Sequence, residues 1–234
     1  MIRPVPFLPR SSVRRPPLRE RLLATPWDVP RSAWYGRLAA LFAMALWCAS
    51  IAFGRMTEIP PVLHLTVILF HEAGHVAFAP FGEALRVAGG TLGQLLVPLA
   101  CAIALHRNAD NFGAALCGAW LGLSLVDASI YAWDAANPVL PLIGGGTGDD
   151  SFHDFVFLFE RYGQLAHAHA WARLMKALGV LLALASLAWA AALLAMQRAQ
   201  RAGAHGTQAE GAHDRQREGA RSTAGTQRAH GTRR

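Results

Sequence analysis

The sequence predicts an all-α protein, a polytopic membrane helix bundle of about five transmembrane helices with disordered N- and C-terminal tails. Of its 234 residues, 53% are hydrophobic and only 16% are charged, whereas about 25% are charged in an ordinary soluble domain. The charges also concentrate before Arg37 and after Met196. A long middle with few charges is typical of membrane-spanning segments rather than of a soluble core.

The two ends of the chain differ in composition from the middle. Residues 1–32 form a basic, proline-rich leader with too little apolar surface to fold alone, so we expect disorder there. No cleavage pattern of small residues follows the first apolar run, and no secretory signal is predicted. Residues 33–196 are the predicted transmembrane domain. Residues 197–234 are rich in Gly, Ala, Arg and Gln, which predicts a disordered low-complexity tail.

Five apolar runs lie within the predicted domain, and a helix needs about 20 such residues to cross a bilayer core. They cover about 37–54, 61–81, 91–105, 112–136 and 171–196. Pro60-Pro61 suits the first turn of the second helix, whereas the third run is short for a full crossing. The segment 137–169 is predicted to be a long loop, in which 152–165 form an interfacial amphipathic helix.

The net charge of +7 comes from arginines in the flanking segments. Neither segment alternates aromatic with basic residues, so they indicate a topology signal and a contact with anionic lipid rather than a nucleic-acid site. Five crossings would put the two arginine-rich ends on opposite sides of the membrane. Arg31 and Arg37 beside the first run favour a cytoplasmic N-terminus, and re-entry of the third run would remove the conflict. Three cysteines lie in apolar runs without metal-type spacing and are interpreted as buried apolar residues (Cys48, Cys101 and Cys117).

The second run contains the most specific motif, His71-Glu72-Ala73-Gly74-His75. Positions i and i+4 of a helix share one face, so His71 and His75 can present ring nitrogens to one zinc ion. Glu72, about 100° further round the helix, is placed to act as general base toward a water and then as acid toward the leaving amine. A glutamate inside an apolar run costs on the order of 2–3 kcal/mol to bury, which indicates function. The alternative is a pair of helix-packing histidines beside a neutral glutamate.

A catalytic zinc site has three protein ligands and one open position, so a third ligand must come from elsewhere. The other acids in the apolar runs are Asp127 and Asp134, seven residues apart on one face of the fourth run. The depth of Asp127 matches that of the histidines and favours it over Asp134, which would then support a ligating histidine. His153-Asp154 is interpreted first as a helix cap, with a substrate gate or an additional ligand as alternatives.

The motif within a membrane helix resembles the site-2 protease family of membrane-embedded zinc metallopeptidases. That resemblance implies a core of three helices, in which a connecting helix follows the motif helix and the next helix bears an aspartate ligand. The stretch Gly90-Thr91-Leu92-Gly93-Gln94 resembles a variant of the family's Gly-Pro-x-x-Asn element, which implies that Gln94 stabilises an oxyanion. The family's Asp-Gly ligand motif is missing, because Ile143 stands where the aspartate is expected.

The resemblance is closer to a group of uncharacterised bacterial peptidase-like membrane proteins. It rests on Tyr131-Ala132-Trp133-Asp134-Ala135, Leu140-Pro141-Leu142 and His153-Asp154. Together the resemblances cover roughly 61–165, about half of the chain. Only the His-Glu-x-x-His part is specific.

The sequence therefore predicts an intramembrane zinc metalloendopeptidase that cleaves transmembrane or membrane-proximal peptides. We expect a multi-pass protein in the lipid bilayer of the bacterial inner (plasma) membrane. The alternative is a non-catalytic peptidase-like membrane protein with a structural or vestigial zinc site. A zinc transporter fits less well, because its ligands would be spread along a path instead of gathered at one depth.

Overall fold

The computed structural model describes residues 17–24, 29–52, 61–140 and 152–231, and every regular element in them is a helix. The prediction of an all-α fold is confirmed. The elements are α1 (Leu18–Leu23), α2 (Arg31–Ala52), α3 (Pro61–Phe78), η1 (Ala79–Phe81), α4 (Glu83–Arg107), α5 (Asn111–Asp134), α6 (Asp154–Arg161), η2 (Leu165–His167) and α7 (Ala168–Gly231). Most of the predicted leader and the segment 141–151, which includes Ile143, lie outside the described residues.

Three helices among the described residues are long and apolar enough to cross a membrane: Glu83–Arg107, Asn111–Asp134 and Leu165–Gly203. The expected number of about five is therefore too high for this part of the chain. The second predicted run appears only as a shorter apolar helix, Val67–Phe81. It stops there because Pro80 lies in a 3-10 turn and Gly82 adopts a φ of 98°, a backbone conformation that glycine tolerates best.

The third predicted run is longer than expected, since α4 begins at Glu83 rather than near residue 91. Gly89 and Gly93 are part of this helix and lie against α3. A Cβ atom on Gly89 would come 2.6 Å from the carbonyl oxygen of Gly74, and one on Gly93 would collide with the carbonyl oxygen of Phe70. Small residues four apart allow two helix backbones to approach this closely. The pair α3–α4 is thus fixed by backbone contact directly beside the motif.

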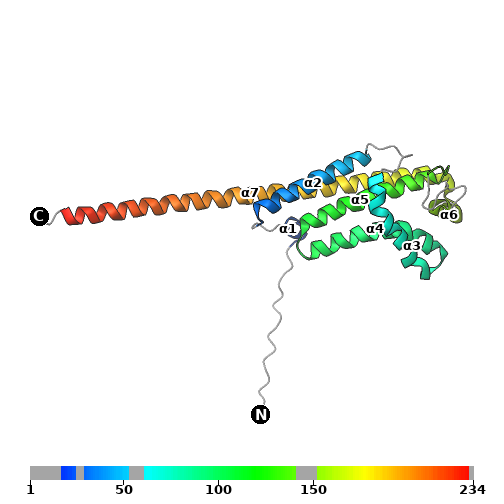
Figure 1. The fold of residues 1–234 in the computed structure, drawn as a ribbon, viewed down its shortest axis with the longest axis horizontal. Helices are drawn as coiled ribbons and strands as arrows, with labels where there is room; N and C mark the ends of the chain where they lie inside the picture. Colours follow the sequence, from blue (N-terminus) through cyan, green and yellow to red (C-terminus); the bar gives the residue numbers. More distant parts are fainter. Residues whose placement is uncertain (1–16, 25–28, 53–60, 141–151, 232–234) are drawn as a thin grey trace, which may run out of the picture.

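Helix α5 lies at the centre of the bundle and packs along α7 (Figure 1). A Cβ atom on Gly122 would come 2.6 Å from the carbonyl oxygen of Gly179, so these two helices also approach backbone to backbone. Near the start of α5, Phe112 and Ala115 pack on Leu193 of α7. Near its end, the core consists of alanines and one phenylalanine from α5, α6 and α7 (Ala132, Ala135, Phe155, Ala168 and Ala172).

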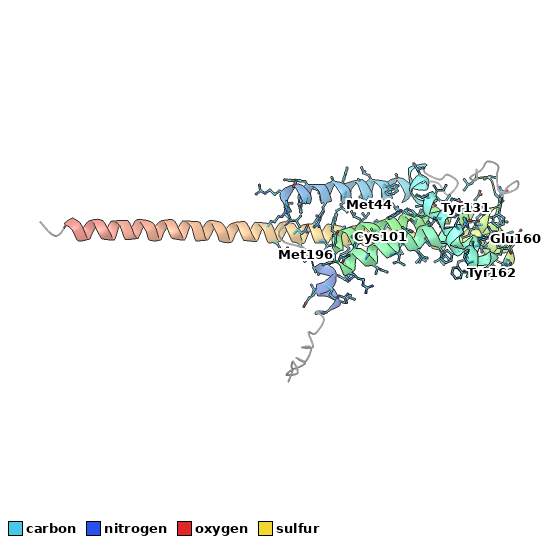
Figure 2. All side chains as sticks on the ribbon, turned by 60° about the horizontal axis from the view of Figure 1, so that its bottom comes forward. Met44, Cys101, Tyr131, Glu160, Tyr162 and Met196 are labelled. Atoms are coloured by element: carbon cyan, nitrogen blue, oxygen red, sulfur yellow. The ribbon has the colours of Figure 1, made fainter. Side chains whose placement is uncertain are left out.

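The contacts of the cluster around Phe112 place the start of α2 beside residues 193–194 of α7, at one end of the bundle. Trp34 of α2 packs in the same cluster as Phe112 and Leu193, so α2, α4, α5 and α7 run in alternating directions (Figure 1). We call this the tail end; it comprises α1, the start of α2, the turn between α4 and α5, and residues 189–201 of α7. The opposite end, which holds the motif, α6 and the start of α7, is the site end. Figure 2 shows Tyr131, Glu160 and Tyr162 toward the site end and Met196 far from them.

Two further expectations concern the helix predicted within the loop and the C-terminal tail. A helix does form within 152–165, as α6, although it spans only Asp154–Arg161. Helix α7 continues to Gly231, through the segment for which the composition predicts disorder. Alanine, arginine and glutamine, which are frequent there, are all good helix formers.

Candidate metal centre

The motif residues lie together on α3 as the helical spacing requires. His71, Glu72 and His75 offer ligand atoms that all lie within 4.8 Å of one another, so the group could hold a metal ion. The two histidines are half-buried and Glu72 is exposed.

The Nδ1 atom of each histidine faces a hydrogen-bond acceptor. His75 Nδ1 lies 2.8 Å from the carbonyl oxygen of Arg86, which can only accept, so His75 carries its proton on Nδ1. His71 Nδ1 lies 2.8 Å from Gln94 Oε1. The amide of Gln94 is oriented by its nitrogen, which donates to the carbonyl oxygen of Ser124 at 2.9 Å. His71 Nδ1 therefore also carries a proton, and each imidazole in its neutral form keeps a lone pair on Nε2.

Both Nε2 atoms face the same carboxylate oxygen. Asp154 Oδ2 lies 3.0 Å from His71 Nε2 and 3.2 Å from His75 Nε2. Distances this short require either a proton on an Nε2 atom or a metal cation among the three atoms, because their lone pairs otherwise repel one another. Ligand atoms of a tetrahedral zinc ion with bonds of about 2.0–2.1 Å are about 3.3–3.4 Å apart. The chemistry and the spacing of the two imidazoles and the carboxylate therefore fit zinc.

Gly90 of α4 leaves the space that such an ion needs. A Cβ atom at this position would come 2.6 Å from His75 Nε2 and would collide with His71 Nε2. Gly90 is itself buried in the helix crossing. Its missing side chain thus keeps the ring nitrogens accessible beside the backbone of α4.

Asp154 is held at the site by residues from the end of α5. Its backbone N–H donates to the hydroxyl oxygen of Tyr131 at 3.2 Å. The neighbouring His153 is the N-cap of α6, where its Nδ1 accepts from the Val156 N–H at 3.3 Å. His153 Nε2 then lies 3.3 Å from Asp134 Oδ2. The cap that Asp154 was expected to provide is thus made by His153, which leaves the Asp154 carboxylate directed at the histidines.

The ionisation of these loop residues follows from their surroundings. Burial lowers the pKa of His153 even though Asp134 and Asp154 oppose the shift. His153 is therefore neutral beside the Asp154 carboxyl group.

Neither of the two acids predicted as the third ligand contacts the motif histidines directly, because another residue lies between. Gln94 Nε2 is 3.5 Å from Asp127 Oδ2, so Gln94 lies between His71 and Asp127. Asp134 lies against His153, and its Oδ1 accepts from the backbone N–H of Leu140 at 3.1 Å. The acid that contacts both histidines is Asp154, which the sequence indicated only as a cap, gate or additional ligand. Both amide atoms of Gln94, the residue expected to stabilise an oxyanion, are engaged within the protein.

Three contributors were not expected from the sequence. The spacing in the sequence could have indicated Tyr131, because it lies four residues from Asp127 and three from Asp134 and so shares their face of α5. The indication for Gly90 is weaker, since paired glycines in an apolar run are consistent with either a loop or a close helix crossing. No sequence pattern indicates the carbonyl oxygen of Arg86, because every residue has a backbone carbonyl oxygen.

Comparisons of the chain with protein-family models, with curated proteins and with solved structures find no match. The fold and the site define the class of protein: the described part of the chain is all-helical, with three helices able to cross a membrane and a His-Glu-His group able to hold a metal ion.

Proposed function

We propose that the protein is an intramembrane zinc metalloendopeptidase, in which His71, His75 and Asp154 hold the zinc and Glu72 is the general base. The observation that carries the proposal is the convergence of two Nε2 lone pairs and Asp154 Oδ2, at 3.0 and 3.2 Å, on one point. Two imidazoles and one carboxylate are a ligand set of catalytic zinc sites. The resemblance to site-2 proteases agrees with it, except that the aspartate comes from the start of α6.

The residues would divide the reaction as follows. Zinc in such a site supplies Lewis acidity, which activates water and polarises a peptide carbonyl. The Glu72 carboxylate lies within 4.8 Å of the histidine ligand atoms, within reach through one water molecule, and takes up the proton that the attacking water loses. It then returns that proton to the nitrogen of the leaving amine. Gln94 and the Arg86 carbonyl oxygen keep the two imidazoles in one orientation.

An open site favours catalysis over a structural role. Structural zinc sites are closed by four protein ligands, whereas catalytic sites leave one position free. The side chains of His71 and His75 remain 14% and 20% exposed, and Asp154 is 7% exposed. Glu72, beside them, is exposed. A peptide can therefore approach the base and the histidines from the same side.

The surface around Glu72 supports a membrane-associated substrate. Leu65, Leu69 and Val76 of α3 are all more than two-thirds exposed, and an apolar helix face of this kind is covered by lipid or by another apolar segment. A transmembrane or membrane-proximal peptide, locally unwound, could lie along this face with its amide bond next to Glu72.

Glu72→Gln tests the proposal. The variant loses the base and keeps all three ligands, so detergent-purified protein should retain zinc but lose at least about a hundredfold in the rate of peptide hydrolysis. The substrate would be a set of fluorogenic transmembrane peptides in micelles. Glu160→Gln, an exposed change on α6, is the control and should hydrolyse at the wild-type rate. Unchanged hydrolysis by Glu72→Gln would remove the proposed mechanism.

A further inference from the structure

Basic residues are distributed unequally between the two ends of the bundle. Among the described side chains, seven arginines lie at the tail end (Arg19, Arg21, Arg31, Arg37, Arg107, Arg198 and Arg201). The site end has four basic residues (Arg86, Arg161, Arg173 and Lys176). It also carries most of the acids, namely Glu72, Glu83, Asp134, Asp154 and Glu160. Lysine and arginine near helix ends determine which side of a membrane a loop occupies, and acids contribute little.

The sequence outside the bundle adds to this difference. The chain before Leu18 and the chain after Gly203 are joined to the tail end, and they contain ten further arginines. The segment 53–60, which links α2 to α3 in the sequence, contains one arginine, Arg55. Because α2, α4, α5 and α7 alternate in direction, the two arginine-rich ends fall on the same side. The conflict expected for five crossings therefore does not arise.

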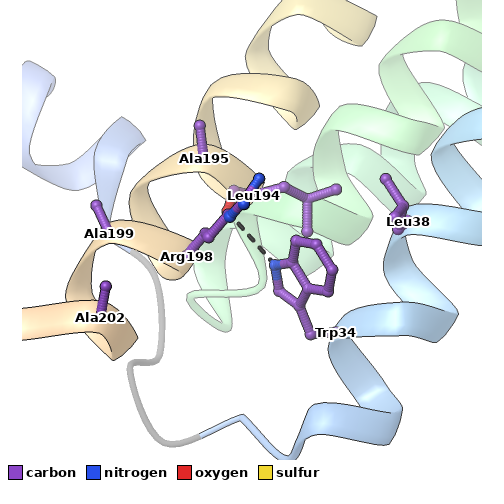
Figure 3. Close-up of a pocket in the computed structure, with 7 residues that line it drawn as sticks. All are labelled: Trp34, Leu38, Leu194, Ala195, Arg198, Ala199 and Ala202. Atoms are coloured by element: carbon purple, nitrogen blue, oxygen red, sulfur yellow. Dashed lines mark hydrogen bonds between the residues drawn. The ribbon is translucent and has the colours of Figure 1, made fainter. Parts of the chain in front are cut away.

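The tail end also has the aromatic residues that mark a membrane boundary. The Trp34 indole N–H donates to the Leu194 carbonyl oxygen at 3.4 Å, next to Arg198, in a pocket of about 490 Å³ between α2 and α7 (Figure 3). The Trp189 indole N–H donates to the Leu22 carbonyl oxygen at 2.9 Å. Arg201 donates to the Pro30 carbonyl oxygen at 3.1 Å. Tryptophan beside arginine is typical of the layer between hydrocarbon and water, at the headgroups of anionic lipids.

We propose that the tail end lies on the cytoplasmic side and that the metal centre opens toward the non-cytoplasmic side of the membrane. This inference rests on the proposed function for its consequence, which concerns the substrate. A peptide cleaved here is a segment of a membrane-anchored or exported chain whose cleavable bond lies in or next to the outer leaflet. Helix α5 separates the two ends by about 36 Å, the length of its 24 residues, so a soluble cytoplasmic peptide does not reach Glu72.

Cysteine labelling in intact bacterial cells tests the orientation without depending on catalysis or on zinc. The chain offers a matched pair, because Tyr162 at the site end is 62% exposed and Tyr35 at the tail end is 63% exposed. Each is replaced by cysteine in a background where the three native cysteines are alanine. A membrane-impermeant maleimide should label Tyr162→Cys in intact cells and Tyr35→Cys only after the membrane is opened. Both variants should react after detergent lysis, which confirms that both thiols are accessible.

The opposite pattern, with Tyr35→Cys labelled in intact cells, would overturn the orientation. Labelling of both or of neither in intact cells would place the two residues on one side and would overturn the alternating topology as well. Hydrolysis is measured separately on purified protein. An inactive protein with the expected labelling would reject the proposed peptidase while leaving the orientation in place.

Discussion

Gln94 Oε1 lies 2.8 Å from His71 Nδ1, so the connecting helix α4 determines how the first motif histidine is oriented. The same amide donates to the Ser124 carbonyl oxygen of α5, and this bond fixes which of its atoms faces the ring. Residues of α3, α4 and α5 thus together determine the tautomer of His71. The interactions behind a ligating histidine are as much a part of a zinc site as the ligand itself.

Replacing Gln94 should therefore weaken zinc binding. In Gln94→Leu the Nδ1 proton of His71 loses its acceptor and the ring loses its orientation, and we expect a 10- to 100-fold loss of zinc affinity. Gln94→Glu keeps an acceptor and should retain more zinc than Gln94→Leu. Competition with a zinc chelator measures both. Equal affinity in the wild type and Gln94→Leu would show that the amide does not orient the histidine.

Gly90→Ala should remove the metal site by filling it. The added methyl group would collide with His71 Nε2 and come within 2.6 Å of His75 Nε2, so the variant should lose most of its bound zinc. Gly36→Ala is the matched control, because nothing lies within 4 Å of a Cβ atom there, and it should bind zinc normally. Elemental analysis of both proteins after purification in detergent makes the comparison. A full complement of zinc in Gly90→Ala would contradict the position given to the metal.

Tyr131→Phe should have a smaller effect than the loss of a ligand. The change keeps the ring beside His153, at a centroid distance of 4.1 Å, and removes only the hydroxyl oxygen that accepts from the Asp154 N–H. One hydrogen bond of this kind contributes about 1 kcal/mol, or about fivefold in zinc affinity. Tyr35→Phe, an exposed tyrosine of α2, is the control. A loss as large as that caused by removing Asp154 would mean that the hydroxyl itself takes part in binding.

The crossing of α5 and α7 should control stability independently of the metal. A Cβ atom on Gly122 would come within 3 Å of the Gly179 carbonyl oxygen and the Ala183 side chain. Gly122→Val should therefore lower the temperature of unfolding by several degrees, since overpacking costs about 1–3 kcal/mol. The amount of zinc bound per folded chain should equal that of the wild type. A variant as stable as the wild type would show that the two helices are not packed this closely.

Features that depend on residues close together in the sequence could be predicted from the sequence alone. The all-helical class, the start of a helix at Pro61 and the proximity of His71, Glu72 and His75 follow from local patterns, because helix geometry alone brings positions i and i+4 together. The length of α4 could not be predicted in this way. Glycine disfavours the middle of a helix when the sequence is considered alone, and Gly89 and Gly93 are helical here because α3 packs against them.

The interpretation of the acids was limited in the same way. Depth along a predicted helix favoured Asp127, but depth gives no information on which residue lies between an acid and the histidine. Gln94 occupies that place. Asp154 lies 83 positions after His71 and is placed by capping and by Tyr131, and neither relationship is visible in a single sequence without coordinates.

The most direct test of the account is the zinc content of Asp154→Ala, measured by elemental mass spectrometry on detergent-purified protein beside the wild type. The wild type should contain about one zinc ion per chain. Asp154→Ala should lose it as completely as His71→Ala does, while Glu160→Ala, an exposed acid on the same helix, should keep it. One zinc ion per chain in Asp154→Ala, with loss in His71→Ala, would contradict the assignment of Asp154 as the third ligand.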